Sequence, residues 1–163
     1  MIEETTPVRL ARTMCVQAAV TMLLILLGAS CMGSDATSKL IDAAAAGDTR
    51  LVQRLVNSGT DPDGRANDDW TALTVSAREG HVAVVKVLLD SGADPNRTEG
   101  GGNTPLFWAA WGGHPEVAKL LLDRGADPEK KCSDCDSPIE IAEKRNNGEV
   151  AALIQRRQKN PSR

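Results

Sequence analysis

The sequence predicts an all-α fold, a solenoid of four helix-turn-helix repeats joined by extended, hairpin-like loops. The main observation is internal repetition, because matching residues recur every 33 positions along the chain. The clearest matching columns are Gly47, Gly80 and Gly113, and the pairs Asp61-Pro62, Asp94-Pro95 and Asp127-Pro128. The second observation is that the chain has only four aromatic residues, whereas a β-sandwich or barrel normally uses more.

The composition excludes several classes of function. The chain has 163 residues with 19 Lys+Arg and 22 Asp+Glu, so its net charge of -3 argues against a nucleic-acid partner. Charged residues make up 25% and apolar residues 41%, which is typical of a folded domain. Two His and four Cys leave little material for a catalytic triad or a metal site. We therefore expect no enzyme activity, no cofactor and no small-molecule substrate.

Residues 1–30 are predicted to form a secretory signal peptide. Arg9 and Arg12 precede the uncharged stretch 13–34, whose most apolar part spans 14–27 and is followed by small residues. A basic flank, a short apolar region and a small-residue exit are typical of such signals. An uncleaved membrane anchor is an alternative, because 22 uncharged residues could just span a bilayer. In both cases the rest of the chain lies outside the cytoplasm.

The exit of this segment, Leu27-Gly28-Ala29-Ser30-Cys31, resembles a bacterial lipobox. The resemblance implies that Cys31 is lipidated and becomes the mature N-terminus; ordinary cleaved secretion without a lipid is the alternative. We therefore expect an exported lipoprotein, anchored to a membrane of the bacterial cell envelope and facing the periplasm. Residues 31–37 would then form a short tether that reaches at most about 20 Å.

Each repeat is expected to contain two helices with recognisable ends. A hydroxyl residue caps the first helix, and Pro follows that cap in the third and fourth repeats. The cap column is Ser38, Thr71, Thr104 and Ser137. Gly47, Gly80 and Gly113 break this helix at a position that requires positive φ, where the fourth repeat has Asn146. The second helix presents one apolar face and ends at a Gly, and Asp-Pro then starts the loop.

These columns divide residues 38–160 into repeats of about 38–70, 71–103, 104–136 and 137–157, followed by a frayed basic tail at 158–163. Departures from the pattern fall in the first and last repeats. Arg54 and Glu143 stand where other repeats have apolar residues or Ala. Because no neighbour covers a terminal repeat, we expect these polar side chains to face solvent.

The repeat pattern closely resembles the ankyrin repeat over residues 36 to 157. The signature stretches are Thr104-Pro105-Leu106, Ala109-Ala110, Gly113-His114 and Gly125-Ala126-Asp127. The resemblance implies a protein that binds other proteins through loop tips and the exposed face of each first helix. Carried over by position, the expected binding residues are Trp70, Arg78, Glu79, Asn103, Trp111, Asp134, Asp136, Lys144 and Arg145.

The tryptophans are the most informative of these residues, because Trp and Arg often anchor protein interfaces. Trp70 and Trp111 occupy columns that are exposed in ankyrin repeats, although partial packing on the adjacent repeat is an alternative. Trp108 is expected to lie mostly in the core. His81 and His114 recur after the break glycines, so we expect them to have structural roles.

The four cysteines divide by position. Cys15 would leave with the signal and Cys31 would carry the lipid, so Cys132 and Cys135 remain in the last loop. In an oxidising compartment we expect this pair to form a structural disulfide. The alternative is an envelope thiol-redox protein that uses the pair, since a C-x-x-C motif near a helix N-terminus lowers a thiol pKa. A zinc site would need two more ligands, and the chain has no second Cys or His pair to supply them.

Overall fold

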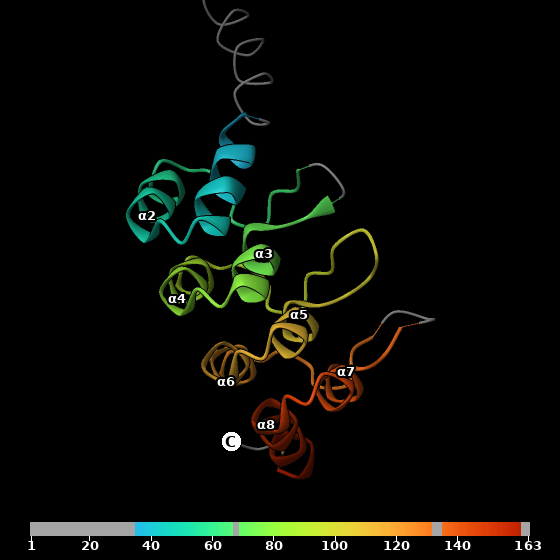
Figure 1. Cartoon of the computed structure of the whole chain (residues 1–163). Coiled ribbons are helices and arrows are strands. Elements are labelled where there is room, and N and C mark those ends of the chain that lie inside the picture. The colour runs from blue at the N-terminus through green and yellow to red at the C-terminus, as the bar shows by residue number, and fades with distance from the viewer. Residues whose placement is uncertain (1–34, 67–68, 132–134, 161–163) are drawn as a thin grey trace, which may run out of the picture. The chain divides into compact units, whose positions relative to one another are not determined.

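The computed structural model describes residues 35–66, 69–131 and 135–160. The helices in these ranges are 35–45, α2 (Thr49–Asn57), α3 (Ala72–Glu79), α4 (Val82–Asp90), α5 (Pro105–Gly112), α6 (Pro115–Asp123), α7 (Pro138–Lys144) and α8 (Gly148–Lys159) (Figure 1). Within these described ranges, β pairing is limited to one antiparallel bridge between Arg65 and Thr71. The predicted all-α repeat architecture is confirmed, with two helices in each repeat.

The helices of residues 36–160 form two rows. Helix α5 packs between α3 and α7 in the row of first helices, while α2, α4, α6 and α8 pack in sequence in the row of second helices (Figure 1). The loops between repeats extend from the row of first helices, on the side away from the second helices. Each repeat therefore contacts mainly its neighbours, as expected for a solenoid.

The first helices begin where the hydroxyl residues predict. The Oγ1 of Thr71 accepts a hydrogen bond from the backbone N–H of Thr74, and Thr104 caps α5 in the same way. Ser137 and Glu140 form a reciprocal capping box at the start of α7. These caps satisfy N–H groups that have no partner within the helix.

The predicted cap at Ser38 is wrong, because helix 35–45 already includes this residue. Ser38 has helical residues on both sides, so its hydroxyl does not stand at a helix start. Residues 35–37, expected to belong to an extended tether, are also helical. The rest of that tether, Cys31 and the predicted signal peptide lie outside the described residues.

The break between the two helices of a repeat has the predicted left-handed backbone. Gly47, Gly80 and Gly113 have φ of 72°, 81° and 73°, and Asn146 has φ of 61°. A Cβ on Gly80 would lie 2.5 Å from the ring of His114 in the next repeat. The glycine is thus required both by its φ angle and by the close approach of its neighbour.

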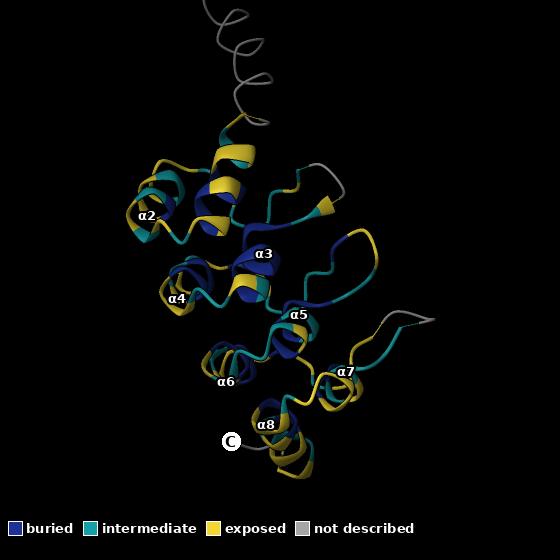
Figure 2. Ribbon diagram, viewed as in Figure 1, coloured by how far each residue is buried: buried dark blue, intermediate teal, exposed yellow. Residues whose placement is uncertain are grey.

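The core lies where the two rows of helices face each other (Figure 2). Ala44, Ala77 and Ala110 are fully buried, and their small side chains let neighbouring first helices approach closely. The second helices contribute larger buried residues, including Val52, Val84, Val85, Leu88, Val117, Leu121, Val150 and Ile154. The predicted apolar face of each second helix is therefore the core face.

The loops are joined by hydrogen bonds that repeat with the array. Asp61, Asp94 and Asp127 each accept a hydrogen bond from the backbone N–H two residues ahead, so each holds the turn at the start of its loop. The next column links adjacent loops, because Asp63 accepts from the N–H of Asp94 and Asn96 accepts from that of Asp127. Asn96 also donates its Nδ2 to the carbonyl of Gly125 at 3.0 Å.

The terminal repeats carry polar side chains where a neighbour is absent. Arg54 and Glu143 are exposed, as predicted. Helix α8 continues to Lys159, so its last turn includes part of the expected tail, and Arg157 pairs with Asp123 at 2.6 Å. Among the described residues, none of the helices is long and apolar enough to cross a membrane.

We predict that Asp63→Asn stabilises the chain at neutral pH. Burial, together with Asp94 and Asp61, raises the pKa of Asp63 above its ordinary value, although the Asp94 N–H and Arg97 act in the opposite direction. Folding therefore favours the neutral carboxyl of Asp63. Its contribution to the free energy of unfolding is lost as the pH rises through the pKa of the folded state. An amide keeps the acceptor and adds a donor toward the Gly92 carbonyl, as Asn96 does in the next repeat. The expected gain is about 0.5–1.5 kcal/mol.

Urea unfolding of both proteins at neutral pH and below pH 3.8, the ordinary pKa of Asp, measures this effect. The advantage of the variant should shrink at the lower pH, because protonated Asp63 is also neutral. A loss of stability at neutral pH would contradict the prediction.

Candidate functional site

All four aromatic residues of the chain, Trp70, Phe107, Trp108 and Trp111, form one group, which we call the aromatic cluster. Trp108 lies at its centre. Its ring centroid is 5.0 Å from that of Trp70, 5.4 Å from that of Phe107 and 5.8 Å from that of Trp111. The tilted and edge-to-face arrangements are those that aromatic quadrupoles favour.

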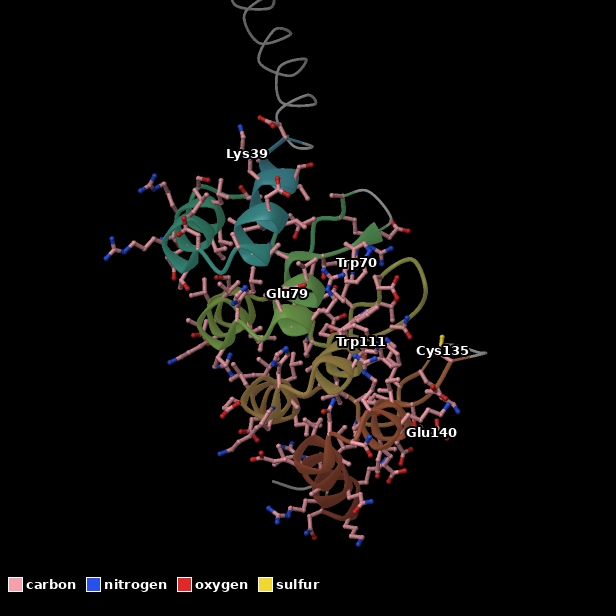
Figure 3. All side chains as sticks on the ribbon, in the orientation of Figure 1. Lys39, Trp70, Glu79, Trp111, Cys135 and Glu140 are labelled. Atoms are coloured by element: carbon pink, nitrogen blue, oxygen red, sulfur yellow. The ribbon has the colours of Figure 1, made fainter. Side chains whose placement is uncertain are left out.

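Local structure positions each ring. Trp70 immediately precedes the cap of α3, and the other three aromatic residues lie on α5. Trp108 and Trp111 are three residues apart and therefore neighbours on the helix surface. Figure 3 shows Trp70 and Trp111 on the side of α3 and α5 opposite to α4 and α6. The aromatic cluster is thus on the face formed by the first helices.

An arginine stacks at each end of the aromatic cluster. The guanidinium carbon of Arg78 is 5.0 Å from the centroid of the Trp70 ring, and that of Arg145 is 4.1 Å from the Trp111 centroid. Both distances are within the range of cation–π attraction. Arg78 also bonds to Glu79, with its Nε 2.8 Å from the carboxylate oxygen. Four of the predicted binding residues, Trp70, Arg78, Trp111 and Arg145, therefore border one continuous surface.

The exposure of the tryptophans differs from the expectation in two cases. Trp111 is 36% exposed, as predicted. Trp70 is half-buried instead of exposed, because its ring packs on Trp108 of α5, which is the alternative weighed for it. Trp108 is also only half-buried, so its assignment mostly to the core is wrong. Its ring forms part of the face instead of filling the space between the two rows.

The indole N–H of Trp108 is buried and has no hydrogen-bond acceptor. A buried donor without a partner costs about 1–3 kcal/mol. The packing of three rings around Trp108 offsets this cost, and so the indole is held by its apolar contacts.

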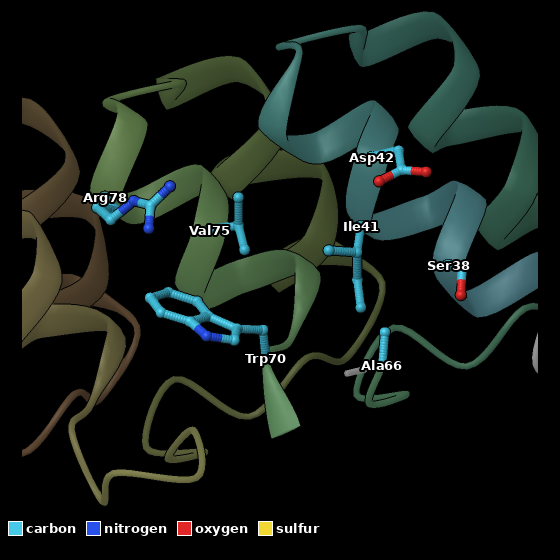
Figure 4. Close-up of a pocket in the computed structure, with 7 residues that line it drawn as sticks. All are labelled: Ser38, Ile41, Asp42, Ala66, Trp70, Val75 and Arg78. Carbon is cyan, nitrogen blue, oxygen red and sulfur yellow. The ribbon is translucent and has the colours of Figure 1, made fainter. Parts of the chain in front are cut away.

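A groove of about 390 Å³ opens beside the aromatic cluster, between helix 35–45 and α3. Its apolar residues include Ile41, Trp70 and Val75, and Figure 4 shows the ring of Trp70 beside Val75 with Ile41 facing them. Asp42 and Arg78 contribute opposite charges to its lining. The groove can thus accept an apolar side chain between two charged groups.

Asn103, expected to bind a partner, takes part in an internal turn. Its backbone N–H and its Nδ2 both donate to Glu99, at 3.1 and 2.7 Å. Glu99 is only 8% exposed and also accepts from the N–H of Gly101. The main role of Asn103 that the structure supports is therefore to hold the loop before α5.

Two of the predicted residues around α7 pair with each other, and a second ion pair lies beside them. Lys144 forms an ion pair with Asp136, and Lys131 lies 3.9 Å from Glu140. Hydrogen bonds from the backbone and side chain of Ser137 hold the pKa of Glu140 below its usual range. Asp134 lies outside the described residues.

Cys135 is disulfide-bonded, and its partner lies outside the described residues. Its Sγ lies 3.9 Å from the carbonyl oxygen of Gly101, a contact that is not a hydrogen bond because a disulfide sulfur carries no proton. Pairing with Cys132 thus stays a prediction. Among the described residues, no group of three His, Cys, Asp or Glu is placed to hold a metal ion.

The histidines have the structural role expected of them. The Nε2 of His81 donates to the carbonyl of Ala45, and that of His114 donates to the carbonyl of Arg78, both at 3.0 Å. Sequence reasoning missed Asn147, which fills the same column in the fourth repeat and donates to Ala110 at 2.8 Å. Its position, 33 residues after His114, was the available signal.

Sequence reasoning also missed Trp108 as the centre of the site and Glu99 as the residue that holds the adjacent loop. For Trp108 a signal was present, because all four aromatic residues fall just before or within two consecutive first helices. For Glu99 no repeat column pointed to burial.

Comparison with known proteins identifies a family. A model described as ankyrin repeats (3 copies) matches residues 40–132, which is more than half of the 163-residue chain. Among curated proteins, none matches the chain.

We predict that Trp108→Ala lowers the free energy of unfolding by about 2–4 kcal/mol, because it removes the ring that the other three aromatics contact. Trp108→Phe should cost less than about 1 kcal/mol, since it keeps a ring and removes the unpaired N–H. Urea unfolding measures both changes. Equal losses in the two variants would show that the indole itself, including its N–H, is required.

Proposed function

The chain belongs to the ankyrin repeat family, and from that premise we propose that it is a scaffold that binds another protein through the aromatic cluster and its two flanking arginines. Ankyrin repeats are generally protein–protein interaction modules and typically carry no reaction. The proposed role is therefore binding, without catalysis and without a cofactor.

One observation carries this proposal. The chain has four aromatic residues and all of them meet on one face, beside Arg78 and Arg145. Trp and Arg are the residue types that most often carry the binding energy of an interface. Stability of the repeats alone would not require such a group, since most core positions here are Ala, Val or Leu.

The adjacent groove supports the proposal that a partner binds at this surface. It lies between the first two repeats, whereas the exposed edge of Trp111 lies on the third. A partner segment that follows the first helices could place one side chain in the groove and another against Trp111. Contact with several successive repeats is how a solenoid gains binding area.

The proposal places this scaffold in the bacterial cell envelope. The basic flank, the uncharged stretch 13–34 and the lipobox-like exit at Cys31 support export followed by lipid attachment. Lipidation would hold the repeats at a membrane surface, where an envelope protein could be the partner.

The disulfide of Cys135 is assigned a structural role in this proposal. Cys135 occupies the column of Gly102, the residue of the preceding loop whose φ is 82°. A covalent link in so short a loop can replace that turn and limit the freedom of the unfolded chain. The rival function, thiol exchange with an envelope protein, rests on the same disulfide.

We predict that a lysine-reactive crosslinker applied to cell envelopes captures a partner with the native protein, and that Trp111→Ala lowers its recovery about 10-fold or more. Val82→Ala is the matched control. It also truncates an exposed apolar side chain, 40% exposed, but at the start of α4 and so outside the aromatic cluster. Recovery with this variant should equal that of the native protein.

Recovery is measured with and without reductant, and urea unfolding confirms that the variants are folded. Equal recovery with Trp111→Ala would place binding elsewhere on the chain. A partner that is held without crosslinker and released by reductant would instead favour the thiol-exchange function.

We predict that the chain, expressed in a bacterial host, incorporates radiolabelled palmitate and fractionates with membranes. Cys31→Ala should abolish the label, because it removes the expected attachment atom, whereas Cys15→Ala is the matched control and should keep it. An unlabelled native chain, or a label that persists in Cys31→Ala, would contradict lipidation at this residue.

A further inference from the structure

The two arginines that stack on the aromatic cluster differ in one respect. Arg78 stacks on Trp70 and also pairs with the carboxylate of Glu79, with a nitrogen–oxygen distance of 2.7 Å. Its guanidinium therefore has both an aromatic face and a carboxylate. This arrangement satisfies the charge and several of its donors within the chain.

Arg145 has the aromatic contact without the carboxylate. Its guanidinium lies over Trp111, and among the described residues no ion pair or hydrogen bond joins its side chain to another group. Arg145 is exposed and caps the C-terminus of α7, where the helix dipole favours a cation. The stacked ring restrains the guanidinium, so less conformational entropy is lost when it binds an anion.

Two other basic side chains near α7 already lie beside carboxylates. Lys144, next to Arg145 in the sequence, pairs with Asp136, and Lys131 lies near Glu140. A polyanion such as nucleic acid would therefore also meet the carboxylates of Asp136 and Glu140 in the segment that carries Arg145, which disfavours it. A single carboxylate that contacts only Arg145 would not be repelled by these carboxylates.

We infer that the partner presents an acidic side chain to Arg145, with an apolar side chain next to it that packs on Trp111. The partner's carboxylate would take the position at Arg145 that Glu79 takes at Arg78. This inference rests on the proposed protein-binding function and specifies the chemistry of the segment that is bound. Arg–carboxylate pairs are bidentate and directional, so this contact would also set the orientation of the partner.

The test uses short random peptides displayed on phage, selected against the full-length chain held in detergent. The selected sequences should be enriched in Asp or Glu next to an apolar residue. Selection against Arg145→Gln should lose the acidic enrichment. The best selected peptide, made synthetically, should bind Arg145→Gln roughly 10- to 100-fold more weakly than the native chain.

Two further variants distinguish the loss of the Arg145 contact from a change in net charge, and unfolding measurements distinguish it from loss of the fold. Lys144→Gln also removes one positive charge, at the residue next to Arg145. Because Lys144 is already paired with Asp136, affinity should change by about twofold or less. Arg145→Lys keeps the charge but loses the planar guanidinium, and affinity should lie between those of the native chain and Arg145→Gln. Urea unfolding confirms that all three variants are folded.

The outcomes distinguish this inference from the function on which it rests. Selected peptides without acidic residues, or acidic peptides that bind Arg145→Gln as well as the native chain, would overturn the inference and leave the scaffold function intact. If no peptide is selected and the crosslinker also captures no partner, both fail. An equal loss in Lys144→Gln would show that net charge, and not the stacked guanidinium, attracts the segment.

Discussion

A hydrogen bond from a side chain at the helix break to a main-chain carbonyl of the preceding repeat joins successive repeats. The bonds run from His81 to Ala45, from His114 to Arg78 and from Asn147 to Ala110. They satisfy carbonyl groups at the ends of the first helices, which have no partner within the helix. The glycines at the break leave room for these side chains and adopt the positive φ that ends the helix. The spacing of α3, α5 and α7 depends on this contact.

The spacing of these helices explains how the aromatic cluster forms on the surface. Trp70 immediately precedes the cap of α3 and Trp108 lies on α5, and their ring centroids lie 5.0 Å apart because these helices pack closely through Ala77 and Ala110. A larger residue at either alanine would separate the helices and the two rings. In this arrangement Trp108 is half-buried and its indole N–H has no hydrogen-bond partner.

The site was only partly predictable. Family position indicated Trp70, Arg78, Trp111 and Arg145, and the structure places these four residues along one surface. The same reasoning selected Asn103, which Glu99 holds in a loop, and it did not select Trp108. A repeat column states which way a side chain points from its own helix. It does not state which side chain of the neighbouring repeat is close enough to pair with it.

The sequence by itself determined the features that are satisfied within a few residues. The caps at Thr71, Thr104 and Ser137, the left-handed break and the Asp turns each depend on local backbone groups, and they could be identified from residue type and spacing. The exception is Ser38, which lies inside helix 35–45 and not at its start. Tertiary structure alone decided that Trp70 packs on Trp108 and that Arg145 stacks on Trp111. Such contacts depend on distances of a few ångströms between side chains from different repeats, and a pattern along the chain does not contain those distances.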